Sequence, residues 1–313
     1  MAWDELRLSR CLTLRDLNVL MTVARCGSMG KAAVQLSLSQ PAISKAIADM
    51  ERSLGVRLLD RGTRGVETTV YARALLERSA IVFDELKEAA KHIEYLAHPM
   101  SGEIRVGCTI AIATGFVSAV VETLSRRYPE ISFHVSAGEA SAIHRALEER
   151  RFDLVIAPMV APSVEEHLHA DILYDEPLVV VAGARSPWSR RRKVELAELK
   201  DAVWALPPPD SLYGSVVAEA FYAHGLGLPR ATVLSSVTPL RNALLASGRF
   251  VSIVQASAVK YGAGEAIKVL PVDLPTTRRA IGLITLRNRT LSPITKLFIE
   301  AARDVAKSAA GRD

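Results

Sequence analysis

The first part of the chain has apolar residues at helical spacing, separated by short polar breaks. Thr13 and Asp16 stand in the order of a capping box, which predicts a helix start, and Gly27 predicts its end. Ser28 can cap a second short helix, MGKAAVQL. The apolar residues that predict the inward face of the first helix are Leu17, Leu20, Met21 and Ala24.

A third predicted helix begins after Ser39, runs to Leu54 and stops at Gly55. Its apolar residues are expected to face the core, and these are Ile43, Ile47, Met50 and Leu54. The spacing then turns another set outward: Gln40, Ser44, Lys45, Asp49 and Arg52. Two short helices joined by the turn at 37–39 form a helix-turn-helix, whose second helix can read bases in the major groove. For the helix pair alone, an ordinary solvated face is the alternative.

The next segment, VRLLDRGTRGVETT, predicts a β-hairpin with its turn at Gly62 to Gly65. Arg61 and Arg64 flank this turn. A basic hairpin beside a recognition helix is a wing, whose arginines can neutralise phosphates or enter the minor groove. The wing therefore favours DNA binding over the solvated-face alternative.

Residues 70–97 contain neither Pro nor Gly and predict one long helix. Its inward positions follow a strict 4,3 spacing with one polar exception: Leu75, Ser79, Val82, Leu86, Ala89, Ile93 and Leu96. Pairing with a second copy would bury this stripe. The alternative is a helix that lies on the core of its own subunit.

The run SQPAISKAIADMERSLGVRLLDR, followed by a long helix, resembles the N-terminal winged helix-turn-helix of LysR-type transcriptional regulators. Length and domain order agree with this family over essentially the whole chain. Ala72 departs from the pattern, because the family usually carries a glycine there. The resemblance implies a homodimer or homotetramer on double-stranded DNA with a palindromic promoter operator, and RNA polymerase is a further candidate partner. The expected DNA-binding residues are Ser39, Gln40, Pro41, Ser44, Lys45, Arg61 and Arg64, and the expected dimerisation residues are Leu75, Val82, Leu86, Ala89, Ile93 and Leu96.

From residue 103 onward, short apolar strands alternate with amphipathic helices, which predicts α/β architecture. The expected strands are EIRVGC, ISFHVS, DLVIAP, PLVVVAG, AVWAL, ATVLSS, FVSIV, IKVLP and AIGLIT. In the family this region is a two-lobed, periplasmic-binding-protein-like (type 2) domain whose cleft binds an inducer. The expected domains are a winged helix-turn-helix at 1–69, a linker helix at 70–98 and an effector-binding domain at 99–313, with one lobe from 103–160 and 268–307 and the other from 163–265.

Hydroxyl residues follow several of these strands and precede helix starts. Helix N-termini and hydroxyls that meet at the carboxyl ends of parallel strands favour a small anion such as a carboxylate. The alternative is that these residues are ordinary helix caps. The expected effector-binding residues are Thr109, Ile110, Ser136, Met159, Pro207, Ser211, Ser236 and Thr238.

Composition adds mainly exclusions. The 313 residues are 49% hydrophobic and 23% charged, which are globular values, and the net charge of +5 is too small to establish an anionic partner. No stretch approaches the roughly 20 apolar residues of a membrane-spanning helix, and the start lacks a signal peptide, so a cytoplasmic protein without membrane contact is expected. Three cysteines far apart exclude a disulfide framework.

Catalytic signals are weak. The segment 26–32 lacks the first glycine and the hydroxyl of a phosphate loop, and His167 and His169 lack further metal ligands, which favours a solvated loop. No G-x-S-x-G elbow is present. We therefore expect no catalytic residue, metal or cofactor. Two rival hypotheses are a two-lobed ligand-processing enzyme with an accessory DNA-binding module, and a solute-binding transport protein.

Overall fold

The computed structural model describes residues 12–62, 65–98, 101–159, 166–262, 266–274 and 277–310. The chain forms two compact units, the N-terminal unit of residues 1–89 and the C-terminal unit of residues 90–313. Within the described ranges, no helix is both long and apolar enough to cross a bilayer.

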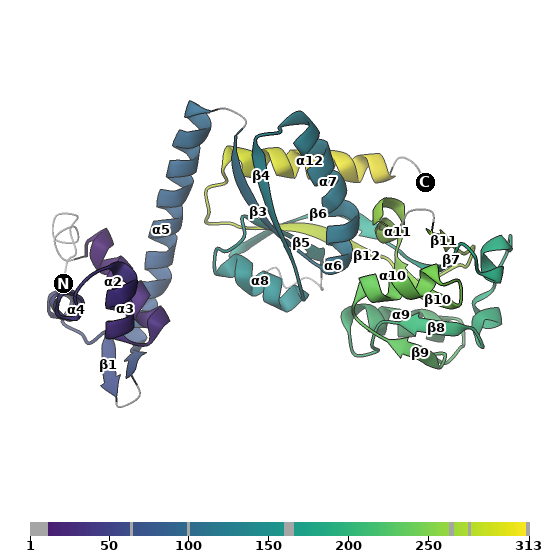
Figure 1. The fold of residues 1–313 in the computed structure, drawn as a ribbon, viewed down its shortest axis with the longest axis horizontal. Coiled ribbons are helices and arrows are strands. Elements are labelled where there is room, and N and C mark those ends of the chain that lie inside the picture. The colour runs from purple at the N-terminus through teal and green to yellow at the C-terminus, as the bar shows by residue number, and fades with distance from the viewer. Residues whose placement is uncertain are drawn as a thin grey trace. The chain divides into compact units, whose positions relative to one another are not determined.

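The N-terminal unit holds three short helices, a hairpin and most of a long helix (Figure 1). The predicted starts are confirmed: Thr13 and Asp16 form a capping box, and Ser28 and Ser39 accept backbone hydrogen bonds as N-caps. The first and third helices end at Gly27 and Gly55 in left-handed conformations. The elements are α2 (Leu14–Cys26), α3 (Met29–Leu36), α4 (Gln40–Leu54), β1 (Leu59–Gly62), β2 (Gly65–Thr68) and α5 (Val70–Ala97).

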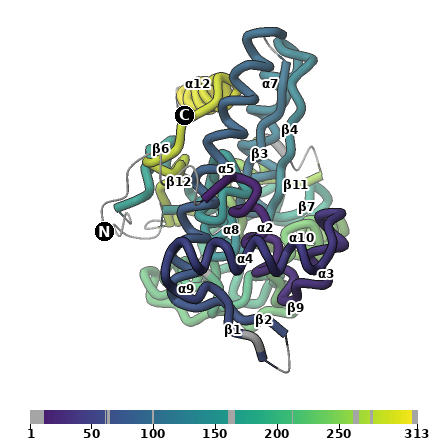
Figure 2. The backbone as a smooth tube through the Cα atoms, turned by 90° about the vertical axis from the view of Figure 1, so that its left-hand side faces the viewer, coloured from purple at the N-terminus to yellow at the C-terminus, as the bar shows by residue number. Residues whose placement is uncertain are grey.

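The apolar faces of these helices form one core. Leu20, Ile43, Ile47 and Leu58 are almost completely buried in it, as the helical spacing predicted for the two isoleucines. Ala72 is also fully buried in this core, so the departure from the usual glycine leaves the helix start intact. Figure 2 shows α4 lying across this unit, with the β1–β2 hairpin projecting beyond the helices.

The C-terminal unit contains two five-stranded sheets, and each forms a lobe. The first lobe has strand order β4-β3-β5-β12-β6, with α7 and α12 on one face of the sheet and α8 on the other (Figure 1). Its strands are β3 (Gly102–Cys108), β4 (Ile131–Ala137), β5 (Leu154–Pro158), β6 (Leu168–Glu176) and β12 (Arg279–Leu286). Its helices are α6 (Ile110–Ile112), the π-helical turn η1 (Ala113–Val117), α7 (Ser118–Arg127), α8 (Ala140–Glu148) and α12 (Pro293–Ala310).

The second lobe has strand order β11-β7-β10-β8-β9, with α9 and α10 on opposite faces. Its strands are β7 (Leu178–Gly183), β8 (Val203–Leu206), β9 (Ala231–Leu234), β10 (Phe250–Gln255) and β11 (Ile267–Val269). Its helices are α9 (Leu212–Ala223), α10 (Thr238–Ala246) and the 3-10 turns η2 (Pro187–Arg190) and η3 (Leu196–Leu199), and α11 (Ala256–Gly262) follows β10.

Two strands lie in a different sheet from the one that the expected lobe boundaries give them. Strand β6 pairs with β12 in the first sheet, and β11 pairs with β7 in the second. The sequence did not predict a strand at 168–176, because charged residues and His169 interrupt the apolar pattern of this segment. The strand is a sheet edge with an exposed Ile172, so His169 lies in a strand and the predicted solvated loop is wrong there.

Candidate functional site

The start of α4 presents polar side chains to solvent. Ser39 caps the helix by accepting a hydrogen bond from the Ala42 backbone N–H at 3.3 Å, and Pro41 occupies the first turn. Gln40 and Lys45 are exposed, and Ser44 is half-buried. The other face of the helix is fixed by the core, so these side chains have a defined direction.

The hairpin is attached to the helices by backbone hydrogen bonds. The Val66 N–H donates to the Gly27 carbonyl at 3.0 Å. The Glu51 carboxylate on α4 accepts from the backbone N–H groups of Leu58 at 2.8 Å and Leu59 at 3.1 Å. The hairpin therefore has a fixed base next to α4. Arg64 and the side chain of Arg61 lie outside the described residues.

The predicted seam of α5 divides into two parts. Leu75 packs on the core of the N-terminal unit, and Ser79 is buried and donates to the Leu75 carbonyl at 2.7 Å. The remaining seam residues are exposed apolar side chains: Val82 at 41%, Leu86 at 45%, Ile93 at 68%, Leu96 at 69%, and Ala89. The self-packing alternative thus accounts for the first turns of the helix and leaves its later apolar stripe uncovered.

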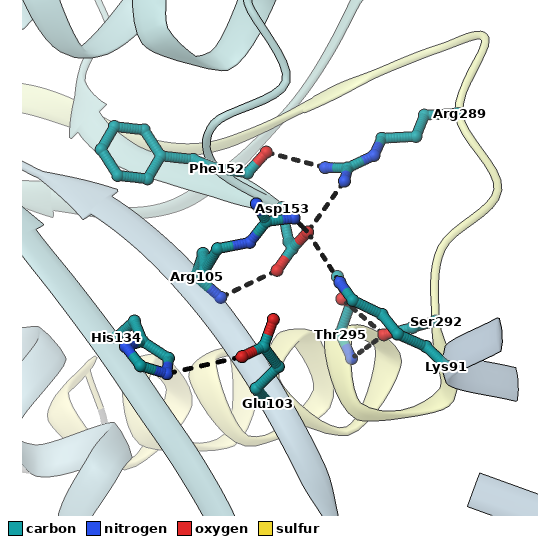
Figure 3. Close-up of polar contacts among 9 residues, drawn as sticks. All are labelled: Lys91, Glu103, Arg105, His134, Phe152, Asp153, Arg289, Ser292 and Thr295. Atoms are coloured by element: carbon teal, nitrogen blue, oxygen red, sulfur yellow. Dashed lines mark hydrogen bonds and ion pairs between the residues drawn. The ribbon is translucent and has the colours of Figure 1, made fainter. Parts of the chain in front are cut away.

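A buried charge cluster lies in the first lobe around Asp153 (Figure 3). Its carboxylate pairs with Arg289 at 2.9 Å, Arg105 at 3.2 Å and Lys91 of α5 at 3.4 Å, and it accepts from the Arg105 backbone N–H at 2.8 Å. Burial raises the pKa of Asp153, but Lys91, the Arg105 N–H and the two arginines outweigh burial and lower the pKa overall. This carboxylate is fully engaged inside the protein and offers nothing to a ligand.

A cavity of about 110 Å³ opens at the carboxyl ends of parallel strands from both lobes. It brings together six of the eight expected effector residues: Thr109, Ile110, Pro207, Ser211, Ser236 and Thr238. The other lining residues are Ala111, Gly138, Glu139, Ala140, Tyr213, Arg241 and Gln255.

Ser136 and Met159 do not line this cavity. Strand β4 runs to Ala137, one residue beyond the predicted end, so Ser136 lies within the strand and Gly138 reaches the cavity instead. The side chain of Met159 lies over Gly282 on β12, because that glycine leaves room for its sulfur. The structure therefore does not bring these two residues together with the other six, and their role in effector binding stays a prediction.

The cap alternative holds for one hydroxyl and fails for another. Ser211 caps α9 by accepting from the Gly214 N–H at 3.1 Å. Thr109 stands at the N-cap position of α6 without a side-chain capping bond, and its buried Oγ1 has no hydrogen-bond partner. Thr238 is nearly buried as the first residue of α10, whose cap makes no side-chain hydrogen bond.

The sequence reading missed Arg241, Tyr213 and Gln255. Arg241 is 4% exposed, its Nη1 donates to the Ser235 carbonyl, and its buried Nε has no acceptor. Burial lowers the pKa of Arg241 to about 10, so the guanidinium remains charged at neutral pH. Among the described residues, no carboxylate pairs with it. Arg241 lies one helical turn after Thr238, and that i, i+3 spacing is the signal that could have identified it.

Other candidate chemistry is absent from the described parts of the chain. No group of three His, Cys, Asp or Glu side chains there can hold a metal ion. His167 Nε2 lies 3.3 Å from Glu148 Oε1, and His169 Nε2 lies 3.3 Å from Asp171 Oδ1. Burial raises the pKa of the Cys108 thiol to about 12, which makes this cysteine unreactive.

Comparison with known proteins supplies the family. The model of the LysR substrate binding domain matches residues 97–307, and that of the bacterial regulatory helix-turn-helix protein, lysR family, matches residues 14–73. The chain is 28% identical to the HTH-type transcriptional regulator GbpR of Azospirillum brasilense, covering 93% of this chain and 86% of GbpR. It is 26% identical to TdcA of Escherichia coli K12, covering 93% and 92%.

Solved structures show the same fold. A full-length OxyR variant from Pseudomonas aeruginosa matches with a TM-score of 0.64 at 22% identity, covering 95% of each chain. Full-length CbnR complexed with its target DNA matches with a TM-score of 0.55 at 21% identity, covering 94% of this chain and all of CbnR. With both family models matched in the order that the fold shows, the chain belongs to the LysR family of DNA-binding transcriptional regulators with an effector-binding domain.

Proposed function

We propose that the chain is a LysR-type regulator that reads a palindromic operator through α4 and the wing, and changes its DNA binding when a small carboxylate-bearing effector occupies the cavity. The DNA-binding domain would be residues 1–69, the linker helix 70–98 and the effector-binding domain 99–313. One observation supports the effector class above all others: the buried guanidinium of Arg241 lines the cavity, and no carboxylate in the described part of the chain pairs with it. A carboxylate would supply that charge and an acceptor for Nε.

The DNA-reading part rests on the direction of two side chains. Gln40 and Lys45 are exposed on the first turns of α4, and we expect Gln40→Ala and Lys45→Ala to weaken binding to the preferred sequence by about 1 to 3 kcal/mol. Full-length protein would first select fragments from genomic DNA, and mobility shift would then compare the selected fragment with a scrambled one. Arg52→Ala, on the last turn of the same helix, is the matched control and should keep the preference.

The wing should behave differently from α4. Arg61→Ala and Arg64→Ala are expected to weaken all sequences alike and to lower the salt dependence of binding, because phosphate contacts carry no sequence information. Unchanged preference in the Gln40 and Lys45 variants would remove α4 from the role of recognition helix.

Assembly into a homodimer or homotetramer is supported by the uncovered apolar stripe on α5. Val82→Glu combined with Leu86→Glu would place four like charges in a paired seam, so light scattering should show smaller species. Lys87→Glu, an exposed neighbour outside the seam, is the charge control and should keep the mass. An unchanged mass in the double variant would exclude this stripe as the interface. RNA polymerase is a further partner that we propose without assigning residues to it.

The alternative of a ligand-processing enzyme with an accessory DNA-binding module is not favoured by the relatives, which are transcriptional regulators. Turnover of a bound acid by the purified protein would favour that alternative.

A further inference from the structure

The cavity contains more unsatisfied polar atoms than a carboxylate can use. Four buried atoms on lining residues have no hydrogen-bond partner that meets geometric criteria among the described residues: Thr109 Oγ1, Tyr213 OH, Arg241 Nε and Gln255 Oε1. They come from the end of β3, from α9, from α10 and from the end of β10. Buried polar atoms are normally satisfied, so four unsatisfied atoms that line one cavity favour a ligand there.

These four atoms differ in what they need. Arg241 Nε can only donate, and the two hydroxyls can donate or accept, so a carboxylate can serve all three. Gln255 Oε1 can only accept. The Tyr213 hydroxyl lies within reach of the Gln255 side chain and can donate to it. A plain carboxylate that takes the Tyr213 hydrogen has none to give to Gln255 Oε1, and so leaves that oxygen unsatisfied.

We propose that the effector is a small acid that also carries a hydroxyl or ammonium group, and that Gln255, with Tyr213, selects this second group. The inference rests on the proposed function, because it assumes that this cavity is the effector site. It adds the second functional group of the ligand and names the residues that distinguish it.

The surroundings of Gln255 and Tyr213 favour a hydrogen donor on the ligand. Burial raises the pKa of the Tyr213 phenol to about 12, the neighbouring Glu176, which is 1% exposed, adds to this shift, and a hydrogen bond with the Gln255 side chain opposes it. The phenol therefore stays protonated at neutral pH. One oxygen of Glu176 accepts from the Ser257 backbone N–H at 2.9 Å, and the side chains of Ser257 and Tyr174 also donate to this carboxyl group. The buried carboxyl group of Glu176, which is close enough to act on Tyr213, disfavours a second anion on the ligand and favours a hydroxyl or an ammonium group.

Gln255 is held in a fixed position, which allows it to distinguish ligands with a hydrogen donor from ligands without one. Its side chain is 3% exposed, and its backbone lies in the last register pair of β10 with β7, opposite Leu178. The next two residues bond across the lobes, since the Ala256 N–H donates to the Pro177 carbonyl at 3.0 Å and the Ser257 N–H donates to Glu176. A fixed acceptor that is left unpaired by the wrong ligand penalises that ligand more than a mobile one would.

The test uses three matched triplets of acids with the full-length protein: propionate, lactate and alanine; succinate, malate and aspartate; phenylpropionate, phenyllactate and phenylalanine. Each triplet varies only the substituent on one carbon, as hydrogen, hydroxyl or ammonium. Calorimetry at neutral pH should show, in the triplet of suitable size, that a donor-bearing acid binds about fivefold to a hundredfold tighter than the plain acid.

Substitutions then assign that preference. Gln255→Leu should reduce the ratio to within about threefold, mainly by weakening the donor-bearing acid, whereas Gln255→Glu keeps an acceptor and should keep or increase the preference for ammonium. Tyr213→Phe should reduce the ratio partly. Arg241→Met should weaken all members of a triplet and leave their ratio unchanged. A denaturant melt of each variant would show that its C-terminal unit is folded.

The possible results separate the two proposals. Equal binding of plain and donor-bearing acids by the wild type, or an unchanged ratio in both Gln255→Leu and Tyr213→Phe, would overturn the inference and leave the proposed effector site standing. Absence of binding by all nine acids would overturn both the inference and the carboxylate part of the proposed function.

Discussion

Two buried polar regions of the C-terminal unit contrast sharply. Around Asp153, the carboxylate bonds to three cations and a backbone N–H, and one buried atom of the cluster, Arg105 Nε, makes no hydrogen bond within the described residues. Around the cavity, Arg241, Gln255 and their neighbours keep buried polar atoms without partners. A buried polar atom without a partner lowers the stability of the protein, and a ligand that bonds to it restores that stability. The Asp153 cluster should therefore serve folding, and the cavity should serve binding.

The largest expected effect is on the free energy of unfolding, through a change in the Asp153 cluster. Asp153→Asn should lower the free energy of unfolding at pH 7 by about 3 to 5 kcal/mol, because it leaves buried cations without their carboxylate. Denaturant melts would measure this. The folded pKa of Asp153 lies below its unfolded value of about 3.9, so its contribution is complete above that value and is lost as the pH falls through the folded pKa. The difference between wild type and variant should therefore shrink in acid; a constant difference would contradict the electrostatic cause.

The matching change in the cavity should have the opposite profile. Arg241→Met should change the free energy of unfolding by no more than about 1 kcal/mol, because the guanidinium has no carboxylate to leave behind. The same variant should bind the preferred acid at least about tenfold more weakly, as expected for a lost charge-assisted hydrogen bond. Melts and calorimetry on one preparation would give both values. A stability loss as large as that of Asp153→Asn would remove the distinction between the two regions.

Glu176 sharpens the contrast because it is a buried carboxyl group with an opposite shift. Burial raises the pKa of Glu176, although hydrogen bonds from Ser257 and Tyr174 oppose it. The folded protein therefore binds the proton more tightly, and stability is lost as the pH rises from the unfolded value of about 4.3 through the raised folded pKa. Glu176→Gln should be more stable than wild type near neutral pH, on the order of 1 kcal/mol, with the advantage fading in acid. Equal melts across this pH range would show that the carboxyl group carries no such cost.

The smallest effect is expected for the Thr109 hydroxyl, which lines the cavity. Thr109→Val keeps the shape of the side chain and removes an unbonded hydroxyl, so stability should hold or rise slightly. Acid binding should weaken by about threefold to tenfold through one lost hydrogen bond. Ser211→Ala is the comparison, since its hydroxyl caps α9 and its loss should cost about 1 kcal/mol of stability. If Thr109→Val binds the acid as well as wild type, Thr109 has no role in the cavity.

The same contrast explains what could be read from the sequence. The caps at Thr13, Ser28 and Ser39 and the buried positions Ile43 and Ile47 are local patterns, and all were predicted correctly. Strand β6 was missed because an exposed edge strand needs only a weak apolar pattern. In the cavity, the pattern of hydroxyl residues before helix starts pointed to Thr109 and Thr238, and both line the cavity. Thr109 is the N-cap of α6, and Thr238 is the first residue of α10.

Arg241, Tyr213 and Gln255 gave no comparable signal. They lie on a helix, another helix and a strand end, where Arg, Tyr and Gln are ordinary surface residues by composition. Their importance comes from burial without partners, which depends on how two lobes meet and not on local spacing. The chemistry of a ligand site between lobes is thus a tertiary property, whereas the helix-turn-helix is largely a local one.

The most direct test joins the two functions in one chain. The affinity for a selected DNA fragment would be measured for wild type and Arg241→Met, each with and without the tightest-binding of the nine acids. We predict that the acid changes the DNA affinity or the mobility of the complex for wild type, and that Arg241→Met binds the fragment equally well without acid but no longer responds to it. A response to acid that is the same in both proteins would place the effector site elsewhere and contradict the role assigned to the cavity.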